Sequence, residues 1–185
     1  MTPLLALTNW TVAIAPPPSE SELKPKSARR WRPVHYGPVE VKVTTLRDCA
    51  IEPFTVDTPE AACAYWARHV ATWPWFDPMK EHLVAIYLNA RRYVLCHHLV
   101  AIGGLDGVVA PGREVYRPGI TISAHAAILL HNHPSGHVDP SSGDIRTTRD
   151  LRRAGDLLGI ELLDHIVVNY DASRHTSIKA LGYFN

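Results

Sequence analysis

Two histidines and one aspartate in the second half of the chain have the residue types and the spacing of a metal site. His131 and His133 stand two residues apart, directly after the apolar run 126–130. Side chains at this spacing lie on the same face of a β-strand, so the two imidazoles can chelate one ion. Asp144 opens a helical pattern after a loop rich in Pro, Gly and Ser. Three such ligands leave a fourth tetrahedral position for water, which is the catalytic pattern of zinc.

A strand and a helix must position these ligands. The apolar run 126–130 predicts a buried strand that leads into His131. Residues 160–168 predict another buried strand. Between them, residues recur at helical spacing and stop at the natural C-cap Gly159; they are Ile145, Thr148, Leu151, Ala154, Gly155 and Leu158. The chain can therefore fold back and carry the aspartate to the two histidines.

The first half of the chain predicts a strand, a helix and a hairpin. Apolar and polar residues alternate over 39–44, which indicates a strand. Residues 57–70 predict a helix, because a small polar cap and a proline precede an apolar stripe. Residues 81–88 and 93–100 predict two strands, and residues 89–91 predict the tight turn between them.

A glycine-rich stretch and a further helix precede the metal-site strand. The stretch 103–107 lacks the lysine and hydroxyl residue of a phosphate-binding loop, so we interpret it as a turn. Residues 113–124 predict a helix, in which Pro118 is tolerable only near the first turns. Strands and helices thus alternate, with at least one hairpin. The sequence predicts an α/β fold with a mixed central β-sheet sandwiched by helices.

Length and composition suit one domain with a tail. The chain has 185 residues, and its 46% of hydrophobic residues can fill a sizeable core. Residues 1–33 hold many prolines and a basic cluster, and they predict a flexible arm ahead of a domain at 34–185. Such an arm could touch nucleic acid or a partner, although a solvated tail is the simpler interpretation.

Charge, cysteine content and hydropathy narrow the setting. A net charge of +1 gives no global field that would require nucleic acid or an anionic membrane. The three cysteines lack C-x-x-C spacing, which argues against a disulfide framework and fits a reducing compartment. No stretch approaches the roughly 20 apolar residues that span a bilayer. We therefore expect a cytoplasmic protein that does not associate with membranes.

The metal-site stretch resembles the JAMM motif of the JAB/MPN metalloproteases, in which H-x-H, ten residues and an Asp bind zinc. Residues 134–143 are the ten intervening residues, and Ser141 stands three residues before Asp144, where the family has its serine. The chain is most similar to the RadC-like bacterial branch of that superfamily. This branch shares the sequence HNHPSG at 131–136 and the ending LGI-x-LLDH at 158–165.

The resemblance covers roughly residues 55–170. It implies a JAB1/MPN-like architecture, which is similar to that of cytidine deaminases. It also implies that Glu81, at the start of a predicted strand, is the family's catalytic glutamate. Full-length RadC proteins carry a helix-hairpin-helix module ahead of this domain, and nothing in residues 1–54 resembles one. We therefore expect a stand-alone JAB domain, in which DNA binding is less favoured.

The chemistry that the resemblance implies is zinc-dependent hydrolysis of an amide or isopeptide bond. Zinc held by His131, His133 and Asp144 would lower the pKa of its bound water toward ~7. Glu81 would take a proton as general base and return it to the leaving amine as general acid. Ser141 would stabilise the oxyanion of a tetrahedral intermediate. The expected substrate is a protein or peptide, such as a ubiquitin-like tail, and the oligomeric state stays open.

Other functions fit parts of the pattern. A DNA-associated RadC-like repair protein, or a mobile-element accessory protein that binds nucleic acid, is the main alternative. The literal His-Asn-His triplet does not indicate an HNH nuclease, because those enzymes take the three residues from separated positions. A zinc deaminase needs H-x-E with P-C-x-x-C, and this chain has neither. Non-catalytic MPN scaffolds lack the zinc ligands that this chain retains.

The sequence points less specifically to a functional role for the other histidines and for the arginines. His97 and His98 would lie on opposite faces of a strand and cannot chelate one metal together. His137 could modulate access to the site, although an exposed loop histidine is the simpler interpretation. His165, beside Asp164, could support the site by donating to a carboxylate, or either residue could make a capping or strand-end hydrogen bond. Four arginines of the last predicted helix could contact phosphates, although a solvated face is the simpler interpretation: Arg146, Arg149, Arg152 and Arg153.

Overall fold

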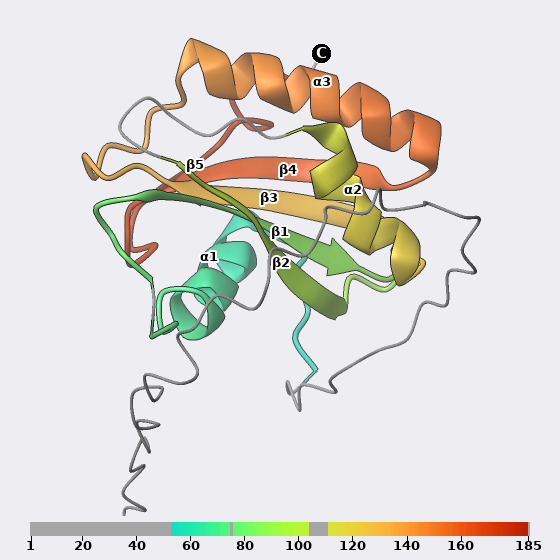
Figure 1. The fold of residues 1–185 in the computed structure, drawn as a ribbon, viewed down its shortest axis with the longest axis horizontal. Helices are drawn as coiled ribbons and strands as arrows, with labels where there is room; N and C mark the ends of the chain where they lie inside the picture. The colour runs from blue at the N-terminus through green and yellow to red at the C-terminus, as the bar shows by residue number, and fades with distance from the viewer. Residues whose placement is uncertain (1–52, 75, 104–110, 185) are drawn as a thin grey trace, which may run out of the picture. The chain divides into compact units, whose positions relative to one another are not determined.

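The computed structural model describes residues 53–74, 76–103 and 111–184. Within these residues, one five-stranded sheet lies between three helices (Figure 1). The strand order across the sheet is β2-β1-β3-β4-β5. In chain order the elements are α1 (Pro59–His69), β1 (Glu81–Leu88), β2 (Val94–Gly103), α2 (Gly112–Thr121), β3 (Ala126–Asn132), α3 (Ser142–Leu158), β4 (Glu161–Val168) and β5 (His175–Ser177).

The sheet is mixed. β1 runs antiparallel to both β2 and β3, β3 runs parallel to β4, and β5 runs antiparallel to β4. Helix α1 covers one face of the sheet, and α2 and α3 cover the other (Figure 1). A parallel pair needs a crossover connection, and α3 supplies it between β3 and β4. This arrangement confirms the predicted α/β fold with a mixed central sheet sandwiched by helices.

The core has two layers because both faces of the central strands are covered. Every residue of β1 and of β3 is buried. Trp66 of α1 packs on one face with Ile86, while Tyr116 of α2 and Leu151 of α3 pack on the other face. Strands that are buried on both sides have near-continuous apolar sequences instead of alternating ones. The apolar runs that predicted these two strands therefore reflect their central place in the sheet.

Some element boundaries differ from the sequence prediction. Gly103 belongs to β2 and pairs with Glu81, so it is part of a strand and not of a turn. Pro118 stands at the seventh of ten positions in α2, and not in the first turns as expected. Proline has no N–H to donate to the Glu114 carbonyl, while its own carbonyl accepts a bond from Ile122 N–H at 3.1 Å. The helix ends before Ser123, whose φ of 54° is left-handed. The sequence did not predict the short strand β5.

Several predictions lie outside the described residues. They are the arm 1–33, the strand 39–44, most of the turn 103–107 and the side chain of Cys49. The other two cysteines, Cys63 and Cys96, are free thiols, as expected for a chain without a disulfide framework. Among the described residues, no helix has both the length and the apolar character needed to cross a membrane.

Candidate metal centre

The ends of β3 and α3 bring His131, His133 and Asp144 into one cluster. His131 is the sixth of the seven residues of β3, His133 follows the strand directly, and Asp144 is the third residue of α3. The two Nε2 atoms are 3.0 Å apart. Asp144 Oδ1 lies 3.4 Å from His131 Nε2, and its Oδ2 lies 3.6 Å from His133 Nε2. The crossover helix starts at the carboxyl end of β3, which is why a short loop suffices to join the ligands.

The spacing and the chemistry of this cluster fit a metal ion. Tetrahedral zinc with nitrogen and oxygen ligands at ~2.0–2.1 Å places those ligand atoms about 3.3–3.4 Å from one another. The three distances between the groups of His131, His133 and Asp144 are 3.0, 3.4 and 3.6 Å, which bracket this value. Among the described residues, this is the one group of three metal-binding side chains whose ligand atoms gather within 4.8 Å. The cluster could therefore hold a metal ion.

Hydrogen bonds on the far sides of the imidazoles orient them toward the cluster. His133 Nδ1 lies 3.1 Å from the His137 carbonyl, and because a carbonyl only accepts, this nitrogen carries the hydrogen. In neutral His133 the lone pair is then on Nε2 and faces His131 and Asp144. His131 Nδ1 has a partner of its own, Nε2 of His165, at 2.9 Å. Electron-rich atoms thus converge on one point, an arrangement that a cation stabilises.

The pKa values of the cluster show the same attraction for positive charge. Burial alone would raise the pKa of Asp144, but the bonds from His131 and His133 outweigh it and hold that pKa well below its usual range. The contact with Asp144 raises the pKa of His133. Imidazole and carboxylate thus stabilise each other's charged forms. The carboxylate is consequently present as the anion that a metal ligand must be.

Ser141 holds the carboxylate of Asp144 at the start of α3. Its hydroxyl donates to Asp144 Oδ2 at 2.6 Å, and its backbone N–H donates to the same oxygen at 2.7 Å. In return, Asp144 N–H donates to Ser141 Oγ at 3.1 Å, which completes a capping box. The serine therefore lies next to the cluster, where the sequence motif puts it. Its expected action on an oxyanion stays a prediction, since its hydroxyl is occupied by Asp144 in this structure.

Glu81 joins the cluster from a distant part of the chain. β1 and β3 are antiparallel with Leu83 opposite His131, so the first residue of β1 lies beside the end of β3. Its Oε1 is 4.0 Å from His131 Nε2, and the residue is only 9% exposed. Burial raises the pKa of Glu81. A carboxyl group with a raised pKa at the edge of a metal-binding cluster is suited to taking up and releasing a proton.

Sequence reasoning missed the role of Asn132, the residue between the two histidines. Its Oδ1 accepts a bond from His82 N–H at 2.9 Å, and its Nδ2 donates to the Lys80 carbonyl at 2.9 Å. Asn132 is fully buried. The side chain thus closes the gap where β1 and β3 stop pairing, and it fixes the backbone on both sides of Glu81. The sequence indicated this role only by placing a polar residue at the end of an apolar strand. An amide side chain has both a donor and an acceptor, so it can replace a missing backbone hydrogen bond between strands.

The structure corrects the expected partners of His165. Its ring does not donate to a carboxylate: Nε2 lies 2.9 Å from His131 Nδ1, and Nδ1 lies 2.6 Å from Thr148 Oγ1. Its backbone N–H donates to Asp164 Oδ1 at 2.7 Å. Burial holds the pKa of His165 well below its usual value. Thr148 belongs to the helical stripe and also to a D-x-x-x-T segment, 144–148, that resembles the RadC-like branch, but no role was expected for its hydroxyl. Both residues lie on the α3 side of the sheet with His131.

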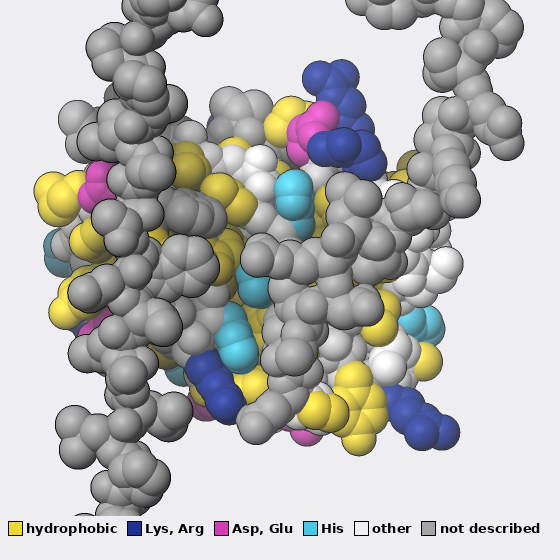
Figure 2. Space-filling model, turned by 60° about the horizontal axis from the view of Figure 1, so that its bottom comes forward, with side chains coloured by type: hydrophobic (Ala, Val, Ile, Leu, Met, Phe, Trp, Pro, Cys, Tyr) yellow, Lys and Arg dark blue, Asp and Glu magenta, His cyan; other side chains and the backbone are white. Residues whose placement is uncertain are grey.

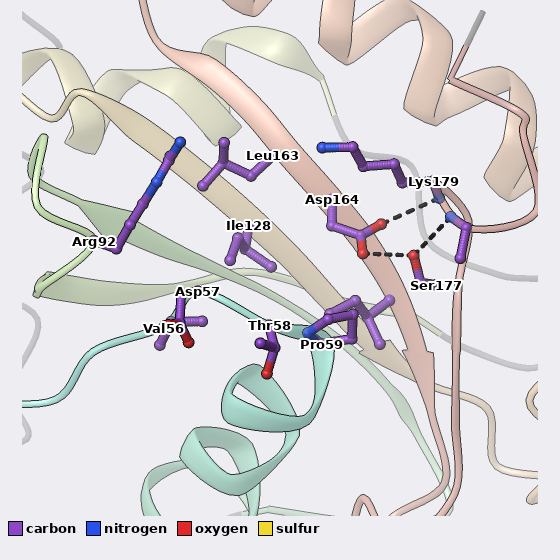
Figure 3. A pocket seen from close by; sticks show the side chains of 12 residues that line it. Val56, Asp57, Thr58, Pro59, Arg92, Ile128, Leu163, Asp164, Ser177 and Lys179 are labelled. Atoms are coloured by element: carbon purple, nitrogen blue, oxygen red, sulfur yellow. Dashed lines mark hydrogen bonds between the residues drawn. The ribbon is translucent and has the colours of Figure 1, made fainter.

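Asp164 belongs to the opposite face of the sheet. It accepts bonds from the Ser177 hydroxyl at 2.6 Å and from the backbone N–H of Lys179 at 3.2 Å. It lines a pocket of about 410 Å³ together with residues of the α1 side, such as Ile128 and Ile166 (Figure 3). Figure 3 shows Ser177 and Lys179 meeting Asp164 from the far side of β4. Asp164 therefore anchors β5 and does not reach the histidine cluster.

The remaining histidines and arginines lie apart from the cluster. His97 Nδ1 lies 2.7 Å from the Tyr65 hydroxyl of α1, while the pKa of His98 is affected by charged residues of α2, so the two face opposite sides as expected. Three arginines of α3 have contacts within the protein: Arg149 with the Tyr183 carbonyl, Arg152 with the Phe184 ring and Arg153 with Asp150. In Figure 2, the visible Lys and Arg side chains lie near the rim of that face, and those at the upper right adjoin an acidic side chain. Association with nucleic acid stays a prediction.

A family model for the RadC-like JAB domain matches residues 56–183. The chain belongs to the RadC-like JAB domain family. The match confirms the resemblance to the JAB/MPN superfamily and its RadC-like branch. It also includes Glu81, Ser141 and the three residues of the metal-binding cluster. The RadC-like JAB domain thus contains every residue for which the sequence predicted a role in the chemistry.

The RadC-like JAB domain of this chain is similar to UPF0758 proteins of several microorganisms. It is 45% identical over 95 residues to one from Chlorobaculum parvum, covering 51% of this chain and 43% of the relative. It is 44% identical over 105 residues to one from Shouchella clausii, covering 57% and 45%. It is 43% identical over 104 residues to one from Methanospirillum hungatei, covering 56% and 45%. The chain spans less than half the length of these curated relatives.

Proposed function

We propose that this RadC-like JAB domain is a zinc-dependent peptidase or isopeptidase that hydrolyses an amide bond in a protein or peptide. One observation carries the proposal. His131, His133 and Asp144 present ligand atoms to a common point, and Glu81 Oε1 lies 4.0 Å from the nearest imidazole nitrogen. Family membership supports it, because the JAB/MPN superfamily includes metalloproteases. The substrate class is a protein or peptide chain, such as a ubiquitin-like tail.

Zinc is the metal that best suits this donor set. Two imidazoles and one carboxylate in a tetrahedral spacing match catalytic zinc sites, which keep one position open. When bound there, zinc supplies a water with a pKa of about 7 and polarises the carbonyl of the substrate. The residues of the chain that hold it are His131, His133 and Asp144. Each of them is kept in place by a further partner: His165, His137 and Ser141, respectively.

Glu81 moves the proton in this proposal. Its carboxylate accepts a proton from the attacking water at Oε1 and gives it to the nitrogen of the leaving amine. The carbon–nitrogen bond breaks as that nitrogen is protonated, and the oxygen of the water stays on the new carboxylate. The burial that raises the pKa of Glu81 brings its proton affinity closer to neutral pH, where both transfers are efficient. Asn132 fixes the backbone that presents this side chain.

Ser141 has two functions in this proposal. Its backbone N–H holds Asp144 Oδ2 at 2.7 Å throughout. Its hydroxyl, which donates to that same oxygen at 2.6 Å, turns to the oxyanion of the tetrahedral intermediate when a substrate is present. The carboxylate keeps one bond to Ser141 during this exchange, so it does not lose its orientation.

The test compares Glu81→Gln with Glu161→Gln. Both glutamates are the first residue of a strand, but Glu161 is exposed and pairs with Ala126, at the opposite end of β3 from His131. Each variant is loaded with zinc, its metal content is measured, and it is incubated with a proteome-derived peptide library and with branched isopeptides. New amines are then labelled and quantified. We expect Glu81→Gln to keep its zinc and to lose about 100-fold or more of the amine release. We expect Glu161→Gln to behave as the unaltered chain does.

Two results would contradict the proposal. One is a zinc-loaded chain that releases no more amine than Glu81→Gln does on any of these substrates. The other is amine release that persists in Glu81→Gln and survives removal of zinc by a chelator. The first result would show that the chain has no peptidase activity on these substrates. The second would show that another group or a contaminant cleaves them.

A further inference from the structure

A line of buried hydrogen-bonding groups connects the two elements that carry the metal-binding cluster. It starts at His131 Nδ1, which is 2.9 Å from His165 Nε2. It continues from His165 Nδ1 to Thr148 Oγ1 at 2.6 Å. It ends where Thr148 Oγ1 donates to the backbone carbonyl of Asp144 at 2.6 Å. The three side chains are at most 2% exposed, so water does not compete for these bonds.

The last acceptor determines the direction of every bond in this line. A carbonyl only accepts, so the hydroxyl hydrogen of Thr148 points to Asp144 O. With that hydrogen used, Thr148 Oγ1 must accept from His165, whose Nδ1 therefore carries a hydrogen. A neutral imidazole has one N–H, so His165 Nε2 is an acceptor and takes the hydrogen of His131 Nδ1. The lone pair of His131 is then on Nε2.

This direction matters because a metal needs the lone pair on the side that faces the cluster. His131 Nε2 lies 3.0 Å from His133 Nε2 and 3.4 Å from Asp144 Oδ1. The opposite tautomer would put a hydrogen there and block coordination. A charged His165 would donate from both nitrogens and would force that tautomer on His131. Such a charge is costly in a fully buried place where neither ring nitrogen has a carboxylate partner.

We propose that His165 and Thr148 are positioning residues that keep His131 in the Nδ1–H tautomer and tie it to the helix that carries Asp144. The line closes on the backbone of a second ligand, so one set of bonds orients both the strand ligand and the helix ligand. This inference rests on the proposed metal site, but it does not depend on what the site hydrolyses. If Thr148 only filled space, replacing its hydroxyl with a methyl group would change nothing at the site. The proposal instead expects a change, so it can be tested.

The first experiment reads the tautomer in the metal-free chain. With histidine rings labelled with nitrogen-15, the ring shifts are expected to show Nδ1–H for His131 and for His165. A nitrogen–nitrogen coupling through the hydrogen bond between them is expected as well. A His131 ring that carries its hydrogen on Nε2 would overturn the proposal, whatever the chain's activity. Because this measurement uses the unaltered chain, it does not depend on whether any variant folds.

The second experiment removes one hydroxyl. Thr148→Val keeps the shape of the side chain but cannot donate or accept, so we expect its zinc affinity, measured by chelator competition, to fall about 10–100-fold. Thr148→Ser restores a hydroxyl and is expected to recover most of the affinity and the wild-type His131 shifts. Thr147→Val makes the same substitution one position away and is the matched control, with unchanged affinity expected. Equal zinc affinity and equal ring shifts in Thr148→Val and in the unaltered chain would overturn the proposal.

The outcomes separate this proposal from the proposed function. If the tautomer and the loss of affinity are as expected but no amide is cleaved, the positioning role stands and the peptidase function is wrong. If amide cleavage is found while Thr148→Val binds zinc normally with unchanged ring shifts, the peptidase function stands and the positioning role is wrong.

Discussion

Ser141 and Asp144 hold each other across the first turn of α3. Ser141 donates its N–H and its hydroxyl to Asp144 Oδ2, and Asp144 N–H donates back to Ser141 Oγ. One carboxylate is therefore both part of the helix cap and part of the metal-binding cluster. A carboxylate in a capping box has a fixed rotamer, and here that rotamer points Asp144 at His131 and His133.

Because Asp144 belongs to both the helix cap and the histidine cluster, substitutions at Asp144 and at Ser141 are expected to differ in their effect on zinc binding. Asp144→Ala is expected to lose the bound zinc, which in the unaltered chain should be close to one per molecule. Ser141→Ala keeps the three ligands and is expected to retain zinc, while the loss of the cap lowers the free energy of unfolding by about 1 kcal/mol. Metal analysis and chemical denaturation measure the two effects. Full zinc retention in Asp144→Ala would show that this carboxylate is not a ligand.

Replacing Asn132 is expected to lower the stability of the fold strongly, although Asn132 has no proposed role in the chemistry. Asn132→Leu leaves His82 N–H and the Lys80 carbonyl without their present partner in a buried place, which costs about 2–4 kcal/mol of unfolding free energy. Asn89→Ala is the comparison, because Asn89 accepts two backbone bonds at an exposed turn, where water can replace it. Hydrogen exchange of the His82 amide should accelerate in Asn132→Leu. An unchanged exchange rate would contradict the clamp.

Replacing Gly155 of α3 with alanine is expected to destabilise the protein, although alanine usually favours a helix. Alanine is favoured over glycine in a helix interior by about 1 kcal/mol. Here, however, an added Cβ would lie 2.5 Å from the Ile160 carbonyl and 2.6 Å from the Tyr116 hydroxyl. Because backbone cannot move aside easily, steric strain should win, and Gly155→Ala should lower the unfolding free energy by about 1–3 kcal/mol. Gly112→Ala, whose Cβ would have no contact closer than 3.7 Å, should leave it nearly unchanged. Denaturant titrations compare the two.

Two thiols, the buried Cys63 and the partly buried Cys96, are expected to make the stability of the protein depend on pH. Burial raises the pKa of Cys63 to about 12 and that of Cys96 to about 11. In a Cys49→Ser background at pH 8, both thiols should therefore react with an aromatic disulfide reagent about 100-fold more slowly than in the unfolded chain. Because the unfolded chain ionises these thiols at lower pH than the native chain, stability should fall as the pH rises above about 9. Fast labelling of the native chain would contradict the burial of Cys63 and the partial burial of Cys96.

Local sequence patterns predicted the elements that carry the cluster. The spacing of His131 and His133 after an apolar run, and the helical spacing of residues after Asp144, are properties of neighbouring positions. Apolar runs and helical periodicity act within a few residues, so they can be read from the chain without knowing the fold. For the same reason the strands β1 and β3 and the helix α3 were predicted nearly at their observed bounds.

Patterns that depend on neighbours far apart in sequence were harder to predict. Pro118 lies in the last turn of α2 and not in its first turns, where the rule for proline placed it. The register of β3 with β4 shifts between Ala127 and Ile128, and the structure places His165 on the face of the histidine cluster and Asp164 on the other face. A register shift changes which face a side chain occupies, and no local pattern in an apolar strand reveals it.

The sequence by itself determined which residue types could bind a metal and on which elements they lie. Only the tertiary structure decided which distant groups join them. Glu81 reaches the cluster because β1 pairs antiparallel with β3, and His165 reaches His131 because β4 lies parallel on the other side of β3. Strand order follows from the packing of the whole core and from chain crossovers, and these are properties of all the elements together. The three candidate ligands are thus local to the chain, while Glu81 and His165 are brought to them by the fold.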